Sequence, residues 1–170
     1  MSVTFALYIL FDFSMLQRPQ TLFLALIVLS MALYLVFPIW QKSVGTETAV
    51  LDAYSLTYTK GEATTETSTL YLAGLALVSA GLALVSLLQY TNRLRQMMLN
   101  LINTLVMVAL LGLSTYLSHI QANAQFAPQT SGSFKVGFFV LAVALLSNVA
   151  ANRFIRIDEK KVKDAFERLR

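Results

Sequence analysis

The sequence contains no cysteine and a single histidine among its 170 residues. Without cysteine there can be no disulfide, no thiolate nucleophile and no cysteine-based metal site. His119 has no second ligand at metal-binding spacing, so we expect no metal. The sequence also lacks a glycine-rich phosphate loop, an HExxH pattern and a Gly-x-Ser-x-Gly elbow. These absences argue against an enzyme, and we expect no cofactor.

Charge is also scarce. Asp, Glu, Lys and Arg together make up 13% of the residues, which is about half the share in soluble proteins, whereas hydrophobic residues make up 56%. The apolar residues gather in long runs that carry no charge in the middle. Since ion and proton pathways usually rely on charges within the membrane, the uncharged runs argue against a pump or a coupled transporter.

Four of the apolar runs are long enough for a helix to cross the ~30 Å core of a bilayer. The predicted spans are residues 21–40, 70–90, 97–118 and 134–154. We place Trp40 in the aromatic belt at the end of the first span. The predicted fold class is an all-α integral membrane protein, with four transmembrane helices in a bundle that forms a single membrane domain over residues 1–170. Residues 1–14 are too short to span, and we expect an interfacial segment, a disordered tail or a mis-annotated start upstream of Met15.

Basic residues are distributed unequally between the two sides of these spans. The joint between the second and third spans carries Arg93 and Arg95 and no acid, and short loops of this kind stay in the cytoplasm. With this joint inside, the predicted cytoplasmic segments hold most of the 13 basic residues, so both termini are predicted to be cytoplasmic. Arginines at the boundary suit anionic lipid headgroups. The predicted topology and headgroup contacts are Arg18, Arg93, Arg95, Arg153 and Arg156.

The longest polar stretch, residues 41–69, falls on the extracytoplasmic side in this topology. Within it Tyr54, Leu56 and Tyr58 alternate with hydroxyl residues, which is a strand pattern. Lys60 and Gly61 can turn the chain, and a threonine-rich segment follows. We predict a small β-hairpin, with a flexible linker as the alternative. An isolated hairpin is marginal in water, so it would have to rest on the helix ends or on a partner.

Five amide side chains fall near one membrane depth, at the cytoplasmic ends of three spans. They are Gln89, Asn100, Asn103, Asn148 and Asn152. Such side chains can hydrogen-bond across helices in lipid, at about 0.6–2 kcal/mol per contact. The favoured interpretation is therefore a structural hydrogen-bond layer, and a shallow binding pocket that faces the cytoplasm is the alternative.

The chain ends in a charged segment that is predicted to be a cytoplasmic amphipathic helix, over residues 155–170. Glu159 and Lys163, like Asp164 and Arg168, are acid-before-base pairs at helical spacing. An apolar stripe lies on another face of this helix. We expect the helix either to continue the fourth span or to lie on the membrane surface.

Both ends of the chain resemble those of a known bacterial membrane-protein family. MLQRPQTLFL at Met15–Leu24 and ANRFIRIDEKKVKDAFERLR at Ala151–Arg170 look like the ends of the family called domain of unknown function 4293. The matching residues are Gln17, Arg18, Gln20 and Thr21 at the start, and Asn152, Arg153, Ile155, Asp158, Glu159, Val162, Arg168, Leu169 and Arg170 at the end. The tail departs from the usual spacing by one additional residue. The resemblance implies a four-span protein of the bacterial inner (plasma) membrane and supplies no function.

Two classes of function fit these features. The first is a non-enzymatic accessory or scaffold subunit of an envelope membrane complex, indicated by the polar outer loop and the basic tail. The alternative is a small transporter or channel subunit that acts as an oligomer, and a weaker third option is an enzyme that uses the amide layer. The expected partners are the lipid bilayer, anionic lipid headgroups at the cytoplasmic face, and either a membrane-protein partner or further copies of the chain. Nucleic acid is not expected.

Overall fold

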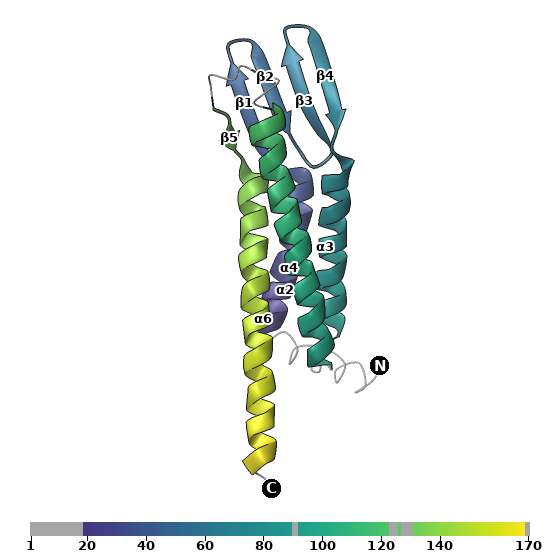
Figure 1. Ribbon diagram of the computed structural model, residues 1–170, viewed down its shortest axis with the longest axis vertical. Coiled ribbons are helices and arrows are strands. Elements are labelled where there is room, and N and C mark those ends of the chain that lie inside the picture. Colours follow the sequence, from purple (N-terminus) through teal and green to yellow (C-terminus); the bar gives the residue numbers. More distant parts are fainter. Residues whose placement is uncertain (1–18, 90–91, 123–125, 127–130, 169–170) are drawn as a thin grey trace, which may run out of the picture.

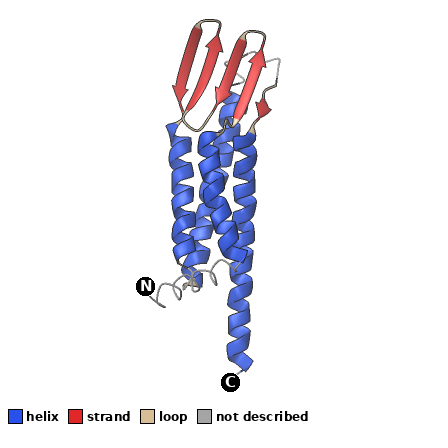
Figure 2. Ribbon diagram, turned by 180° about the vertical axis from the view of Figure 1, so that it is seen from behind, coloured by secondary structure: helices blue, strands red, loops and turns tan. Residues whose placement is uncertain are grey.

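The computed structural model describes residues 19–89, 92–122, 126 and 131–168. Four long helices lie side by side, and a five-stranded antiparallel sheet caps one end of them (Figures 1 and 2). The helices are α2 (Pro19–Val36), α3 (Leu70–Leu88), α4 (Arg93–Tyr116) and α6 (Val136–Arg168). The molecule is therefore a mixed α/β fold, and the prediction of an all-α four-helix bundle is wrong.

The four helices share one apolar core. Helix α2 packs against α3 and α6, and α4 packs against the same two helices. Every helix contributes fully buried side chains, such as Ile27, Ala76, Leu110 and Leu141. The alanines of α3 let the neighbouring backbones approach closely, as small residues do in helices packed in lipid.

Three of the described helical segments are long and apolar enough to cross a membrane. They are Leu70–Leu88, Arg93–Ala122 and Val136–Lys160, whereas the apolar segment of α2, Gln20–Val36, is shorter. Large hydrophobic side chains such as Leu77, Leu105 and Leu146 are exposed on the outward faces of these three helices. Exposed apolar surface on this scale marks contact with lipid or with another protein.

The first helix ends earlier than predicted. Pro38 disfavours helical geometry at the residue before it, and α2 stops at Val36. The backbone N–H of Ile39 then donates to Leu51 O (2.8 Å), and strand β1 (Trp40–Val44) begins. Trp40 is 1% exposed. It is therefore a core residue between the sheet and the helices, not a side chain exposed in an interfacial belt.

The sheet contains the expected hairpin as only one of its parts. This hairpin is β3 (Ser55–Lys60) with β4 (Ala63–Ser68), and β1 pairs in the same way with β2 (Glu47–Leu51). Gly45 and Gly61 turn the two hairpins at φ +58°, a conformation that glycine adopts without strain. Strand β5 (Ser133–Phe134) pairs with β1 and completes the order β4-β3-β2-β1-β5. The hairpin thus rests on the helix ends as part of a larger sheet.

A buried cation lies beneath this sheet. A π-helix, η1 (Leu117–Ala122), continues α4 toward it. Lys42 of β1 is 3% exposed, and its Nζ donates to Phe126 O (2.8 Å) while lying 5.3 Å from the centre of the Phe126 ring. A buried ammonium needs such partners. Lys42 thus ties the sheet to Phe126, which follows η1 in the sequence.

Candidate functional site

Two of the predicted amide residues, Asn100 of α4 and Asn148 of α6, are hydrogen-bonded to each other where α3, α4 and α6 pack together, in the half of the helices away from the sheet. Asn100 Oδ1 accepts from Ser86 Oγ (2.8 Å), and Asn148 Nδ2 donates both to Asn100 O (2.9 Å) and to Thr104 Oγ1 (2.8 Å). Ser86, Asn100 and Asn148 are fully buried. The hydrogen bonds therefore join three helices at one level. We call the five predicted amides, together with Ser86, Gln96 and Thr104, the amide layer.

Three members of the amide layer were missed in the sequence analysis: Ser86, Gln96 and Thr104. Gln96 is buried, and its Nε2 donates to Ser86 O (3.0 Å). It lies four residues before Asn100, which lies four residues before Thr104, so all three share one face of α4. The predicted third span begins at residue 97 and leaves Gln96 in the joint before it. In the structure α4 already begins at Arg93, with Asn92 as its N-cap. The spacing of four residues therefore identifies Gln96 and Thr104 as neighbours of Asn100, once the helix is known to begin at Arg93.

Of the other predicted members, Gln89 is half-buried at the end of α3 and Asn103 is completely buried. The amide layer keeps unused hydrogen-bonding capacity. Its buried atoms without a hydrogen-bond partner are Gln96 Oε1, Asn100 Nδ2, both polar atoms of Asn103, Asn148 Oδ1 and Asn152 Oδ1. Each buried polar group without a partner costs about 1–3 kcal/mol. The layer thus contains more buried polar atoms than its own hydrogen bonds use.

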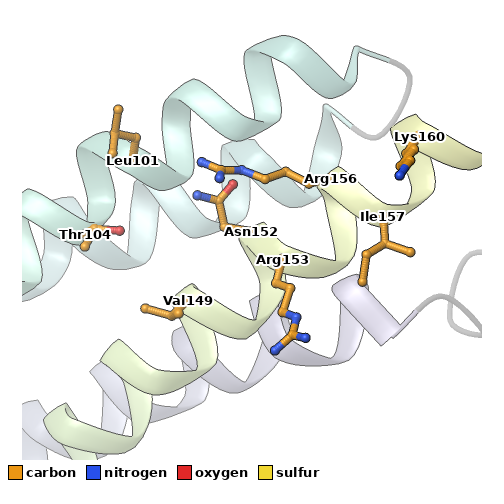
Figure 3. Close-up of a pocket in the computed structure, with 8 residues that line it drawn as sticks. All are labelled: Leu101, Thr104, Val149, Asn152, Arg153, Arg156, Ile157 and Lys160. Carbon is orange, nitrogen blue, oxygen red and sulfur yellow. The ribbon is translucent and has the colours of Figure 1, made fainter. Parts of the chain in front are cut away.

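A groove of about 510 Å³ lies beside the amide layer, between α4 and α6 (Figure 3). Its lining residues are Leu101, Thr104, Val149, Asn152, Arg153, Arg156, Ile157 and Lys160. Thr104 belongs to both the layer and the groove. Figure 3 shows that Asn152 and Arg156 extend toward α4, while Arg153 points to the other flank of α6. The groove therefore joins neutral amide and hydroxyl groups to fixed positive charge.

The predicted arginines lie in different surroundings. Arg153 and Arg156 are exposed and line the groove. Arg93 is half-buried, and its Nη1 donates to Asp158 O on α6 (2.5 Å). Arg95 is exposed at the start of α4, and Arg18 lies outside the described residues. Arg93 thus joins the start of α4 to α6.

The polar and charged side chains of this region have the chemistry of a binding surface. Neutral amides and hydroxyls beside guanidinium and ammonium groups can hold polar or anionic groups. Within the described parts of the chain, no three His, Asp or Glu side chains gather as a metal site would require. His119 is exposed at the other end of α4, where its ring lies 5.6 Å from that of Phe134.

A second candidate surface is the edge of the sheet at β4. All six residues of β4 are exposed, and their pairing with β3 runs from Ser55↔Ser68 to Lys60↔Ala63 without a bulge. At the tip of the sheet, Lys60 Nζ lies 3.1 Å from Glu47 Oε1, and the Tyr58 hydroxyl donates to Glu47 Oε2 (3.0 Å). These hydrogen bonds lower the pKa of Glu47, so its carboxylate stays charged and bridges β2 and β3. The β4 edge thus belongs to a sheet whose inner strands are also linked by side-chain hydrogen bonds.

Two matched substitutions separate an amide that makes interhelical hydrogen bonds from one that makes none. Asn148→Leu removes two interhelical hydrogen bonds and is expected to lower the free energy of unfolding by about 1–3 kcal/mol. Asn103→Leu removes two buried atoms without partners, and is expected to leave that free energy unchanged or to raise it by about 1 kcal/mol or more. Thermal unfolding of both variants in detergent measures the difference. Equal losses in the two variants would contradict this assignment of hydrogen bonds.

A family model described as Domain of unknown function (DUF4293) matches residues 16–169. The match takes in all four helices and all five strands. No curated protein and no solved structure matches the chain.

Proposed function

Because the chain belongs to the family described as Domain of unknown function (DUF4293), as the resemblance at its two ends implies, we propose for it a role that rests on its structure alone. The role is that of a non-enzymatic accessory or scaffold subunit in an envelope membrane complex. The observation that carries this proposal is an exposed, unbulged edge strand, β4, on a sheet that membrane-type helices hold at one end.

The proposed setting is the bacterial inner membrane. Three helices have the length and apolarity of membrane spans, and α2, at 18 residues or about 27 Å, is within the range of a fourth. Arg93 and Arg95 favour a cytoplasmic joint between α3 and α4. This orientation places the sheet on the extracytoplasmic side and both termini in the cytoplasm.

The β4 edge suits a partner that adds a strand. Edge strands are usually protected by lysine, proline or bulges, because their unpaired N–H and C=O groups template another strand. Strand β4, with the sequence ATTETS, has one charge, Glu66, and none of these protections. In strand addition the main-chain hydrogen bonds supply affinity. The proposed occupant is an extended extracytoplasmic segment of another envelope protein.

A second copy of the chain fits this edge poorly. The strands run close to the long axis of the helices (Figure 2), which is the membrane normal in the proposed setting. Two copies in one membrane are related by rotation about that normal, so their β4 strands would run parallel and present identical edges at the same height. Parallel ladders need a staggered pairing, and antiparallel pairing would need the opposite orientation of one copy. The geometry therefore favours a different chain.

Proline substitution at the edge tests this role. Successive N–H groups of a strand point to opposite edges, so of Thr64→Pro and Thr65→Pro one removes an outward donor and the other a donor to β3. Tagged full-length protein is extracted from native membranes, and its stoichiometric partner is identified and quantified for both variants. The outward variant should keep the thermal unfolding of the parent and lose at least about tenfold in partner recovery.

The same experiment addresses the alternative of a transporter or channel that forms as an oligomer, which the unsatisfied atoms of the amide layer favour. Recovery of further copies of this chain alone, unchanged by either proline, would support that alternative. It would also overturn the role of the β4 edge.

A further inference from the structure

The groove between α4 and α6 carries positive charge along one side. Arg156 and Lys160 line it from α6 four residues apart, so they lie along one side of that helix, while Arg153 borders the groove and points to the other flank. All three are exposed. The adjacent carboxylates, Asp158 and Glu159, are not among the lining residues. The groove therefore has a net positive wall that no lining carboxylate neutralises.

The groove is also apolar at one end. Leu101 and Val149 line the half nearer the sheet, together with Thr104, and these two apolar side chains are each 57% exposed. From Val149 to Lys160 the α6 wall extends over about 16 Å, with polar Asn152 in between. Along α6 the lining thus begins with apolar Val149, continues with the amide of Asn152 and ends with the cations Arg156 and Lys160, with Ile157 between them.

Donors for an anion converge where the apolar and cationic ends meet. Asn152 and Arg156 both extend toward α4 in Figure 3. A guanidinium offers a planar fork of donors that matches two oxygens of a phosphate. The Thr104 hydroxyl already donates to Asn100 O (2.9 Å), so it serves as a wall and not as a further donor. The anion would therefore be held by α6.

We propose that this groove binds a phosphate-bearing anionic lipid, with the phosphate at Arg156 and Asn152 and an acyl chain along Leu101 and Val149. The apolar end lies on a helical segment with the character of a membrane span, Val136–Lys160, and the cationic end lies at the limit of that segment. A free phosphate would use the cationic end alone and would leave the exposed apolar wall without a role. The combined lining therefore selects an amphiphile.

The charge of the groove is tested on the purified full-length protein in detergent. Native mass spectrometry measures retention of phosphatidylglycerol and of phosphatidylcholine with the same acyl chains. The unsubstituted protein should favour phosphatidylglycerol, and Arg156→Gln should weaken that binding about tenfold. Arg95→Gln makes the same charge change on the same side of the molecule, outside the groove, and should change binding less than about twofold. Equal losses in both variants, or no loss in Arg156→Gln, would overturn the site.

The apolar wall and the source of the phosphate are tested in the same way. Leu101→Gln should weaken lipid binding, whereas Leu105→Gln, which lies one turn along α4 and outside the groove, should not. Inorganic phosphate at millimolar concentration should fail to displace the lipid. Displacement by inorganic phosphate, with no effect of Leu101→Gln, would assign the groove to free phosphate and overturn the lipid proposal. The readout is a lipid and not a protein, so it is independent of partner binding at β4.

Discussion

Replacing Trp40 with alanine is expected to lower the free energy of unfolding by about 3–5 kcal/mol, the largest effect of any single truncation that we predict. Trp40 is the largest fully buried side chain, and it pairs with Leu51 of β2 and with Phe134 of β5. The indole also lies so close to Gly132 that a Cβ atom added at that glycine would overlap it. Its removal leaves a cavity where the sheet meets the helices.

Thermal unfolding in detergent measures this loss, with Tyr54→Ala as the control. Tyr54 is also a large aromatic residue of the sheet region, but it is 48% exposed. We expect the control to cost less than about 1 kcal/mol, because its side chain leaves no closed cavity. Similar losses in the two variants would show that the sheet is not held through Trp40.

Gly137→Ala is expected to lower the free energy of unfolding by about 1–3 kcal/mol or more. A Cβ at Gly137 would lie 2.7 Å from Phe37 O and 2.9 Å from Pro38 O. Both are backbone atoms, so the start of α6 would have to move away from the link between α2 and β1. That movement would also strain the hydrogen bond from Gly137 N to Pro38 O (3.0 Å).

Gly112→Ala is the matched control for this substitution. Gly112 lies within α4, is exposed, and has open space around an added Cβ. Alanine favours a helix by about 1 kcal/mol over glycine, so this variant should be unchanged or more stable. The two substitutions are thus expected to act in opposite directions in thermal unfolding. A loss at Gly112 equal to that at Gly137 would contradict the close approach at Gly137.

The helical part of the fold could be predicted because its signal is local. Long uncharged runs mark α3, α4 and α6, whereas the first run extends past Pro38 and hides the end of α2 at Val36. The sheet beyond β3 and β4 could not be predicted in this way. Strands β1 and β2 have five residues each, and Trp40 suits the end of a membrane helix as well as a strand. The two residues of β5 pair with β1, which lies more than 90 positions earlier in the sequence. No local sequence pattern predicts a pairing over that distance.

The asparagines of the amide layer could be predicted from the sequence, whereas its hydroxyl residues could not. Asparagines such as Asn100 and Asn148 stand out in apolar helices, because an amide in that setting needs a partner. Hydroxyl residues carry less information, since they can donate to the carbonyl of the preceding turn. Thr104, Ser114, Thr115 and Ser147 all do so. Only the packed structure shows that Thr104 also accepts from Asn148.

Helix α6 has a mechanical consequence. It starts two residues after β5, which is paired into the sheet, and continues for 33 residues without a break (Figure 1). Such a helix is about 50 Å long. A rigid tilt of about 5° at the sheet would displace its far end by about 4 Å, together with the helices packed against it. In the proposed membrane setting, a strand docked on the sheet is therefore linked through α6 to the opposite side of the membrane.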